Sequence, residues 1–190
     1  MVTTVVPFRA GGKTRLPEPL RAELALAMLG DVLEAAAAVG EVRLVTADAG
    51  ASALAGELGA SVVPDPGGGQ GAAVLAGLAG LGGPALVVNA DLPCATASAL
   101  RALIGLAPAV VPALDGTTNA LALVAPATFL PRYGPGSATR FADDGFALAS
   151  VPELVHDVDT VGDLAGIVLP LGHRSAAAGR RHRAVREPAA

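Results

Sequence analysis

A glycine loop with three basic residues stands out near the start of the chain, in the stretch FRAGGKTRL at 8–16. It contains the only lysine of the sequence, Lys13, close to Arg15 and directly after Gly11 and Gly12. Glycines let the backbone come close to a ligand and turn its N–H groups toward an anion, while basic side chains add charge. The spacing differs from the P-loop pattern G-x-x-x-x-G-K-[ST]. The loop therefore predicts either a site for a phosphate chain or an ordinary turn.

Two acidic motifs further along the chain have the residue types of a metal site. Asp91 lies in NADLP at 89–93, and Asp157 and Asp159 lie in HDVDT at 156–160. Carboxylates at strand ends that face a basic loop would hold a divalent metal against phosphates. Of the last two aspartates, we expect one to face the cleft and the other to cap the helix that follows. Asp91 taken alone is also explained as a turn or helix-entry residue.

Three further stretches combine glycine with hydroxyl or amide groups. They are PDPGGGQGAA (64–73), DGTTNAL (115–121) and YGPGSATRF (133–141). The first is a flexible loop with few side chains that could wrap a base or a ribose. The third contains Ser137, where a helix that receives an anion could begin. Each stretch is equally explained as a turn.

The elements that must position these residues alternate along the chain. Seven apolar runs predict strands: TTVVPF (3–8), VRLVT (42–46), ASVVPD (60–65), ALVVNAD (85–91), AVVPAL (109–114), ALALVAP (120–126) and ELVHDVD (153–159). Helices are predicted near 19–39, 50–58, 70–82 and 96–106, with short ones after Ser137 and Thr160. This alternation indicates an α/β fold with a mostly parallel sheet covered on both faces, which binds ligands beyond the carboxyl ends of its strands.

Length and composition indicate one domain in the cytoplasm. The 190 residues are 52% hydrophobic and 16% charged, which suits one buried core and not two. No apolar run reaches the roughly 18 residues that a membrane helix needs. The N-terminal MVTTVV lacks the features of a secretory signal, and the single Cys94 excludes an internal disulfide. We therefore expect a cytoplasmic protein with no membrane partner.

The end of the chain differs in composition from the rest. Residues 173–190 hold five arginines and one acid, with alanines and glycine between them and no apolar period. This pattern predicts a disordered, solvated tail at 173–190 behind a domain at 1–172, in preference to a surface for nucleic acid or membrane.

Taken in order, AGGKTRL, PDPGGGQGAA, NADLP, DGTTNAL, YGPGSATRF and HDVDTVGDL resemble the MobA-like nucleotidyltransferases. The likeness covers most of the chain. It is greatest to the guanylyltransferases that act on 2-phospho-L-lactate or phosphoenolpyruvate in the synthesis of the deazaflavin coenzyme F(420). The first loop and the DLP carboxylate are shared by the whole group, whereas the TNAL, GPGS and DVDT motifs narrow the match to the guanylyltransferases. The resemblance implies a three-layer, Rossmann-like nucleotidyltransferase fold.

The resemblance also implies roles for individual residues. Lys13, Arg15 and Asp91 would be catalytic, with the two basic residues on the triphosphate of GTP. Asp91 and Asp159 would bind Mg²⁺, and Asp157 would be a reserve ligand. The nucleotide would be bound by Gly11, Gly12, Lys13, Gly69 and Gln70. A small phospho-acid would be bound through its phosphate or carboxylate by Thr118, Asn119, Gly134 and Ser137.

The implied reaction fits the residue types. A phosphate oxygen of the acceptor attacks the α-phosphorus of GTP and pyrophosphate leaves, so the nucleophile is already an anion and no general base is needed. Two alternatives stay open. One is another MobA-like transferase with a molybdopterin or sugar-phosphate acceptor, and the other is a nucleotide-binding module without catalysis. The oligomeric state, a homodimer included, also stays open.

Overall fold

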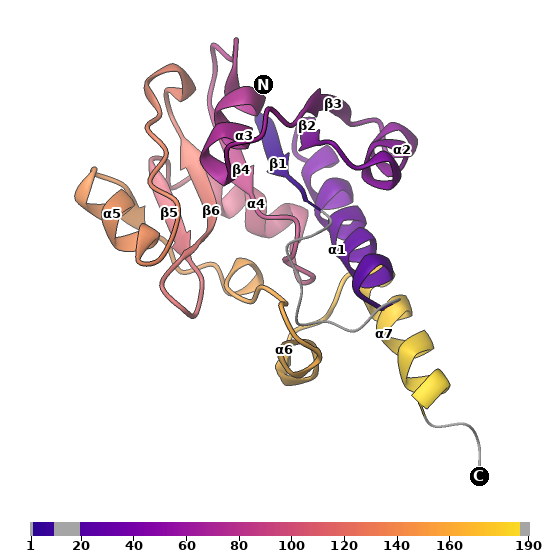
Figure 1. The fold of residues 1–190 in the computed structure, drawn as a ribbon. Coiled ribbons are helices and arrows are strands. Elements are labelled where there is room, and N and C mark those ends of the chain that lie inside the picture. Colours follow the sequence, from indigo (N-terminus) through magenta and orange to yellow (C-terminus); the bar gives the residue numbers. More distant parts are fainter. Residues whose placement is uncertain (1, 10–19, 187–190) are drawn as a thin grey trace.

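The sheet at the centre of the molecule is built from seven strands in the described part of the chain (Figure 1). The computed structural model of the protein describes residues 2–9 and 20–186. The strands are β1 (Thr3–Pro7), β2 (Glu41–Thr46), β3 (Ser61–Pro64), β4 (Ala85–Val88), β5 (Ala109–Pro112), β6 (Thr118–Leu123) and β7 (Ala147–Leu148). Their order across the sheet is β3-β2-β1-β4-β6-β5-β7.

One strand runs against the others. β6 pairs antiparallel with both β4 and β5, whereas the other neighbouring strands pair parallel. The mostly parallel sheet expected from the sequence is therefore confirmed. All four residues of β4 are buried, because helices cover both faces of the sheet here, and this explains why its sequence is apolar without alternation.

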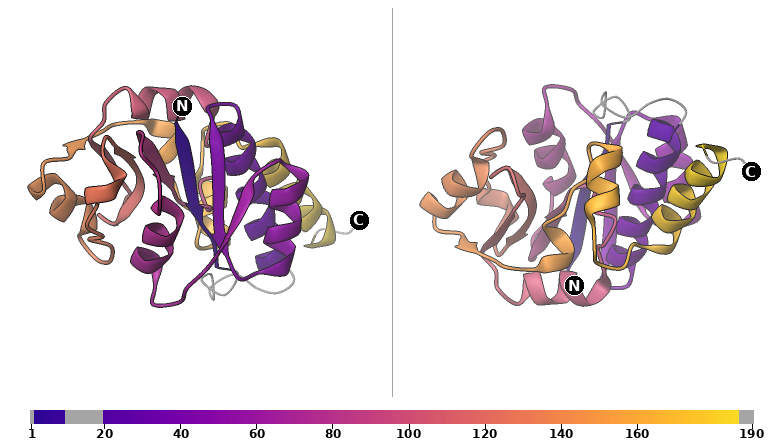
Figure 2. Two further views of the ribbon diagram at one scale, coloured as in Figure 1. Left: turned by 90° about the horizontal axis from the view of Figure 1, so that it is seen from above. Right: turned by 90° about the horizontal axis from the view of Figure 1, so that it is seen from below.

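Helices pack on both faces of the sheet (Figure 2). They are α1 (Leu20–Ala37), α2 (Ala49–Glu57), α3 (Gln70–Leu78), α4 (Ala97–Ile104), α5 (Ser137–Asp143), α6 (Val161–Gly166) and α7 (His173–Arg186), with the 3-10 turns η1 (Pro126–Thr128) and η2 (Pro152–Leu154). One buried apolar cluster joins α1, α2 and α4 to the sheet, and a second joins α3 and α5 to it. This is the expected three-layer arrangement. Of the described helices, none is both long and apolar enough to cross a bilayer.

The stretch ELVHDVD at 153–159 is not a strand, so that expectation was wrong. It begins in η2 and continues without regular structure to α6. Pro152 has no N–H to give to a sheet, and the backbone oxygens of Leu154 and Val155 accept hydrogen bonds from the side chain of Asn119 instead. The apolar pattern of this stretch therefore serves burial and not strand pairing.

Residues 173–186 form helix α7, where the sequence predicted a disordered tail. The helix lies antiparallel along α1 (Figure 1 and Figure 2), because Arg174 pairs with Glu34 and Arg181 with Glu23. Alanine and arginine both favour helix. The arginines of α7 dock on acids of α1, so the helix forms although its sequence has no apolar period. Residues 187–190 lie outside the described residues.

Candidate active site

Three carboxylates meet beyond the carboxyl end of β4. Asp91 follows that strand, and Asp157 and Asp159 lie in the segment that leads into α6. One carboxylate oxygen from each residue lies within 4.8 Å of those of the other two. The backbone N–H of Val158 donates to the backbone oxygen of Asp91 at 3.2 Å, which ties the two segments together. The structure thus brings Asp91 and Asp159 to one place, together with Asp157. We call these three residues the acidic cluster.

The helix after the cluster is capped by a threonine. The Thr160 hydroxyl accepts from the N–H of Asp163, and the Asp163 carboxylate accepts from the N–H groups of Asp159 and Thr160. The expectation that either Asp157 or Asp159 caps α6 was wrong, because this capping box already supplies the N-terminal partners of the helix. Both side chains lie at the cluster instead.

The cluster has the charge distribution of a cation site. Burial raises the pKa of the Asp157 carboxyl above its ordinary value, and the negative charge of Asp91 raises it further. The amide of Asn119, at 3.5 Å from Asp157, opposes this rise only in part. A cation among the three oxygens would relieve the repulsion, and carboxylate oxygens are the ligands that Mg²⁺ takes in proteins. The donor set therefore fits a divalent metal.

A cavity of about 270 Å³ opens beside the cluster. Its wall includes the apolar residues Pro7, Phe8, Met28 and Ala73 and the polar residues Arg9, Gln70, Asn89, Asp91 and Asp159. Of the residues that the sequence predicted, Gln70, Asp91 and Asp159 line this one cavity. An apolar wall with a few converging polar groups suits a ligand that has both an aromatic base and anionic groups.

A two-pronged ion pair fixes Arg9 at the cavity. Its Nε and Nη2 donate to the two carboxylate oxygens of Asp65, at 2.5 and 2.9 Å. The same carboxylate accepts from the N–H of Gly67 at 2.9 Å, so the loop after β3 sets its position. The guanidinium is held in one orientation while the Arg9 side chain is 46% exposed, so it can present charge to an anion. Sequence reasoning missed Asp65, although Asp-Pro-Gly directly after a strand indicates a carboxylate that turns back on its own loop.

Two amides form a chain of hydrogen bonds in the cavity wall. Gln70, at the start of α3, donates through Nε2 to Oδ1 of Asn89 at 2.8 Å, and Asn89 donates through Nδ2 to the backbone oxygen of Thr118 at 3.0 Å. A backbone oxygen can only accept, so it determines the orientation of both amides. Gly69 before the helix has a φ of 94°, a conformation that favours glycine. The sequence predicted Gly69 and Gln70, but the role of Asn89 depends on partners that are distant in the chain.

Asn119 was expected to contact a phospho-acid, and the structure gives it protein partners. The residue is 1% exposed, and its Nδ2 donates to the backbone oxygens of Leu154 and Val155 at 3.1 and 2.8 Å. Through these bonds β6 holds the segment that carries Asp157 and Asp159. Asn119 therefore helps to hold the acidic cluster in place through the backbone of the segment that precedes Asp157.

A further group of predicted acceptor residues, Thr118, Gly134 and Ser137, is joined by hydrogen bonds. The hydroxyls of Thr118 and Ser137 pair at 2.8 Å, and the N–H of Ser137 donates to the backbone oxygen of Gly134 at 3.0 Å. Gly134 has a φ of 114°, which glycine alone adopts readily. The structure brings these three residues together, but they are not part of the cavity wall described above. Their contact with a phospho-acid stays a prediction.

The predicted triphosphate residues Gly11, Gly12, Lys13 and Arg15 lie outside the described residues. The residues before them, Phe8 and Arg9, line the cavity. The described chain thus reaches the cavity wall at Arg9, and the contacts of Lys13 and Arg15 with a triphosphate stay predictions.

The single cysteine is not suited to covalent chemistry. Cys94 is 1% exposed, and burial raises the pKa of its thiol to about 11. A thiol with such a pKa stays protonated at neutral pH and is a poor nucleophile. Covalent catalysis through this thiol is therefore not expected.

Asn119→Ala should destabilise the protein. It leaves the buried backbone oxygens of Leu154 and Val155 without their donor, at a cost of about 1–3 kcal/mol, or roughly 2–12 °C in Tm for a chain of this size. Differential scanning calorimetry checks this, with Thr128→Ala as control, since the hydroxyl of Thr128 bonds to a backbone oxygen at an exposed position. Equal melting temperatures for Asn119→Ala and the control would contradict the role.

Comparison with known proteins agrees with this geometry. The profile of the MobA-like NTP transferase domain matches residues 11–140. The phosphoenolpyruvate guanylyltransferase of Thermomonospora curvata is 39% identical over 95% of this chain and 88% of its own length. That of Streptomyces coelicolor is 37% identical over 94% of this chain and 96% of its own. A candidate nucleotide-diphospho-sugar transferase from Desulfovibrio desulfuricans G20 aligns at a TM-score of 0.72 and 17% identity, over 98% of this chain and 97% of its own, and shows the same fold.

These matches confirm the resemblance seen in the sequence motifs. The family profile includes Lys13, Arg15 and Asp91, and the curated relatives align over nearly the whole chain. The chain belongs to the MobA-like NTP transferase family, among the phosphoenolpyruvate guanylyltransferases.

Proposed function

We propose that the protein transfers GMP from GTP to the phosphate of phosphoenolpyruvate and releases pyrophosphate, as a step in the synthesis of coenzyme F(420). 2-Phospho-L-lactate is the alternative acceptor of the same chemical class. The observation that carries the proposal is the convergence of the acidic cluster, Arg9 and Gln70 around one cavity. The identity of the chain to phosphoenolpyruvate guanylyltransferases supports GTP and this acceptor.

Asp91 and Asp159 are the proposed ligands of Mg²⁺, with Asp157 beside them. Their oxygens are close enough together for one ion to touch all three. Mg²⁺ held by these residues would supply positive charge to the transferred phosphoryl group and to the departing pyrophosphate. Asp91 and Asp159 also face the cavity, so they would orient that charge toward the nucleotide.

The nucleotide is proposed to lie along the cavity wall. Lys13 and Arg15 bind its triphosphate, with Gly11 and Gly12 giving N–H groups to the same oxygens. Gly69 and Gln70 bind the nucleoside, where the fixed amide of Gln70 and the apolar residues Phe8 and Ala73 support a base. Arg9 adds a further cation that Asp65 keeps in place.

The reaction needs positioning more than proton transfer. A phosphate oxygen of the acceptor forms a bond to the α-phosphorus of GTP. The bond from that phosphorus to the bridging oxygen of the β-phosphate breaks, and pyrophosphate leaves with the electron pair. Because the attacking oxygen is an anion, the task of the basic residues is to hold two polyanions together and to screen their repulsion.

The acceptor is proposed to lie on the side of the acidic cluster that faces β6 and α5. Thr118, Asn119, Gly134 and Ser137 shape this side through the buried hydrogen bonds described above. Asn119 connects it to the cluster, because it also holds the segment of Asp157.

Phosphorus NMR of the product tests the proposal. The protein is incubated with GTP, Mg²⁺ and phosphoenolpyruvate, and the new diphosphate linkage is expected to give two coupled phosphorus signals alongside that of free pyrophosphate. Pyrophosphate without the coupled pair would mean hydrolysis of GTP and would contradict transfer to the acceptor. Parallel runs with 2-phospho-L-lactate identify the preferred acceptor.

Lys13→Ala should mainly weaken the use of GTP. A charge-assisted hydrogen bond to a phosphate is worth about 1.5–3 kcal/mol, so the KM for GTP should rise by roughly 10- to 100-fold. Steady-state kinetics at saturating acceptor measure this rise. Arg180→Ala is the matched control, since it removes an exposed cation on α7. An unchanged KM and kcat in Lys13→Ala would mean that the opening loop is an ordinary turn.

A further inference from the structure

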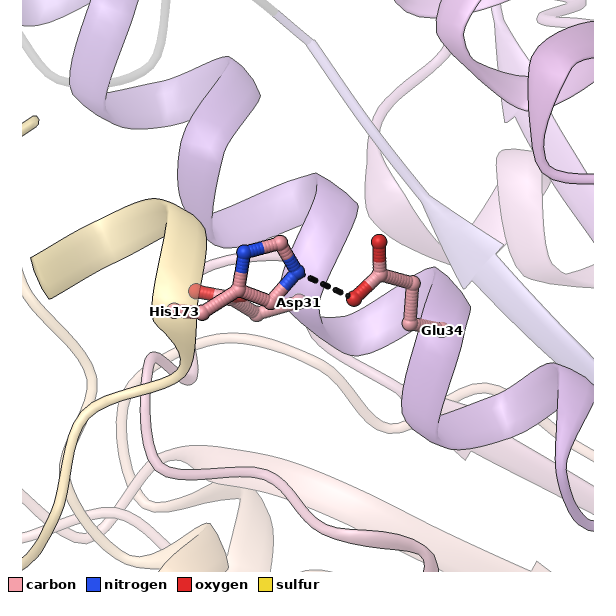
Figure 3. Close-up of side chains that lie close together, drawn as sticks. All are labelled: Asp31, Glu34 and His173. Atoms are coloured by element: carbon pink, nitrogen blue, oxygen red, sulfur yellow. Dashed lines mark hydrogen bonds and ion pairs between the residues drawn. The ribbon is translucent and has the colours of Figure 1, made fainter. Parts of the chain in front are cut away.

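The first turn of α7 is held by a carboxylate of another helix. Asp31 of α1 is 4% exposed, and its two carboxylate oxygens accept from the backbone N–H groups of Arg174 and Ser175 at 3.0 and 2.9 Å. Figure 3 shows Asp31 of α1 beside His173, the first residue of α7. The first N–H groups of a helix have no partner within the helix, so Asp31 acts as the N-cap that the sequence before α7 does not provide.

The same turn touches the loop that carries Asp91. The N–H of Gly172 donates to the backbone oxygen of Pro93 at 2.7 Å, two residues after Asp91. A Cβ atom at Gly172 would lie 2.2–2.6 Å from side-chain atoms of Asp31, so no larger residue fits between the two. The N-terminus of α7 is therefore fixed against both α1 and the loop after β4.

Further along, α7 packs against the segment that carries Asp157 and Asp159. Ala178 is fully buried in a small apolar cluster with Leu24 and Met28 of α1 and with Val158. Val158 lies between Asp157 and Asp159, and its N–H bonds to the backbone of Asp91. α7 thus closes the packing around the one residue that separates two of the three carboxylates.

Asp31, Glu34 and His173 also lie close enough together to suggest a metal site (Figure 3). Their ligand atoms already have protein partners, because Glu34 pairs with His173 and with Arg174, each at 2.8 Å, and Asp31 caps the helix. The guanidinium of Arg174 pairs with Glu34, and its positive charge would repel a metal ion at this place. The group therefore joins α7 to α1, with Asp31 acting through backbone hydrogen bonds away from solvent and Glu34 through more exposed ion pairs, which contribute little.

We propose that Asp31 is a positioning residue for the acidic cluster. By fixing the first turn of α7 it keeps Ala178 in the apolar cluster that also holds Val158, and so keeps Asp157 and Asp159 at the distance from Asp91 that a shared cation requires. The inference rests on the proposed function of the cluster as a metal site. Asp31 is buried and does not line the cavity, yet it should affect the affinity of the acidic cluster for a metal.

Titration of the full chain with Mn²⁺, followed by the EPR signal of the free ion, measures that effect without turnover. Loss of residues that orient metal ligands typically costs 10- to 100-fold in affinity, so the Kd of Asp31→Ala should rise by about tenfold. Asp31→Asn keeps one acceptor oxygen and should lie between wild type and Asp31→Ala. Glu34→Gln is the matched control: it removes half-exposed ion pairs of the same two helices and should stay within about twofold of wild type.

The result that would overturn the proposal is a lower Tm with an unchanged Mn²⁺ Kd, since this would make Asp31 a purely structural residue. If Asp31→Ala does not fold, the comparison of Asp31→Asn with Glu34→Gln decides: equal Kd values overturn the proposal, and a higher Kd in Asp31→Asn alone supports it. Mn²⁺ binding that depends on Asp31, in a protein that transfers no guanylyl group, would count against the proposed function and leave this inference standing.

Discussion

Asp91→Asn should lower the rate of Mg²⁺-dependent pyrophosphate release by about 100- to 1,000-fold, the size of effect seen when a main electrostatic group of a transition state is lost. Asp91 contributes one of the three converging oxygens and also faces the cavity. An amide in its place has a similar shape but lacks the charge that a divalent cation requires. The loss should appear in kcat at saturating GTP and acceptor, measured by a coupled pyrophosphate assay.

Asp48→Asn is the control for this substitution. Asp48 also follows a parallel strand, β2, but it caps α2 by accepting from the N–H of Ala51 at 2.7 Å. Asparagine is an equally good N-cap, so the helix and the activity should both be retained. Near-normal turnover in Asp91→Asn, with the control also active, would remove the metal assignment.

Asp157→Asn should change activity and stability in opposite directions. Burial and the neighbouring carboxylates raise the pKa of Asp157, so in the metal-free protein its charge is a strain on the folded state. Removing that charge should raise the Tm of the metal-free protein by no more than a few degrees, because Asp157 is partly exposed and solvent screens part of the repulsion. The same change should lower turnover by about 10- to 100-fold, because it takes an oxygen charge from the cluster.

The stability of the metal-free protein should depend on pH through Asp157. A carboxyl whose pKa is higher in the folded state binds its proton more tightly there than in the unfolded chain, so its contribution to stability falls as pH rises through the window between the two pKa values. This is opposite to the usual behaviour of an aspartate. Thermal unfolding of the metal-free wild type and of Asp157→Asn across acidic to neutral pH measures the difference. A stability gain in Asp157→Asn that shrinks as pH rises would contradict the account.

Sequence reasoning placed the three carboxylates at one edge of the sheet because strand ends are recognisable. An apolar run that stops at a carboxylate places Asp91 at the carboxyl edge of a parallel sheet, and there the ligand is expected whatever its identity. Asp157 and Asp159 were placed at the same site although the strand expected before them does not exist. Their segment is held by hydrogen bonds from the side chain of Asn119 and by the burial of its own Val158. Neither interaction produces a periodic pattern in the sequence.

Interactions between distant polar residues were beyond the reach of sequence reasoning. The pairing of Arg9 with Asp65 depends on the three-dimensional distance between two loops. Helix α7 was missed for the same reason, since the cap from Asp31 and the ion pair of Arg181 with Glu23 replace an apolar stripe. Polar docking of this kind has no period from which a helix could be predicted.

The most direct test of the central claim, that this site joins GTP to a phospho-acid, is pyrophosphate release with Mg²⁺ in a matrix of substrates. GTP, ATP and CTP are each combined with phosphoenolpyruvate, 2-phospho-L-lactate and 3-phosphoglycerate, with the folded state of the protein verified by circular dichroism. We expect release with GTP and phosphoenolpyruvate, and little release with either of the other nucleotides. Absence of release from every pair by the folded protein would contradict the claim.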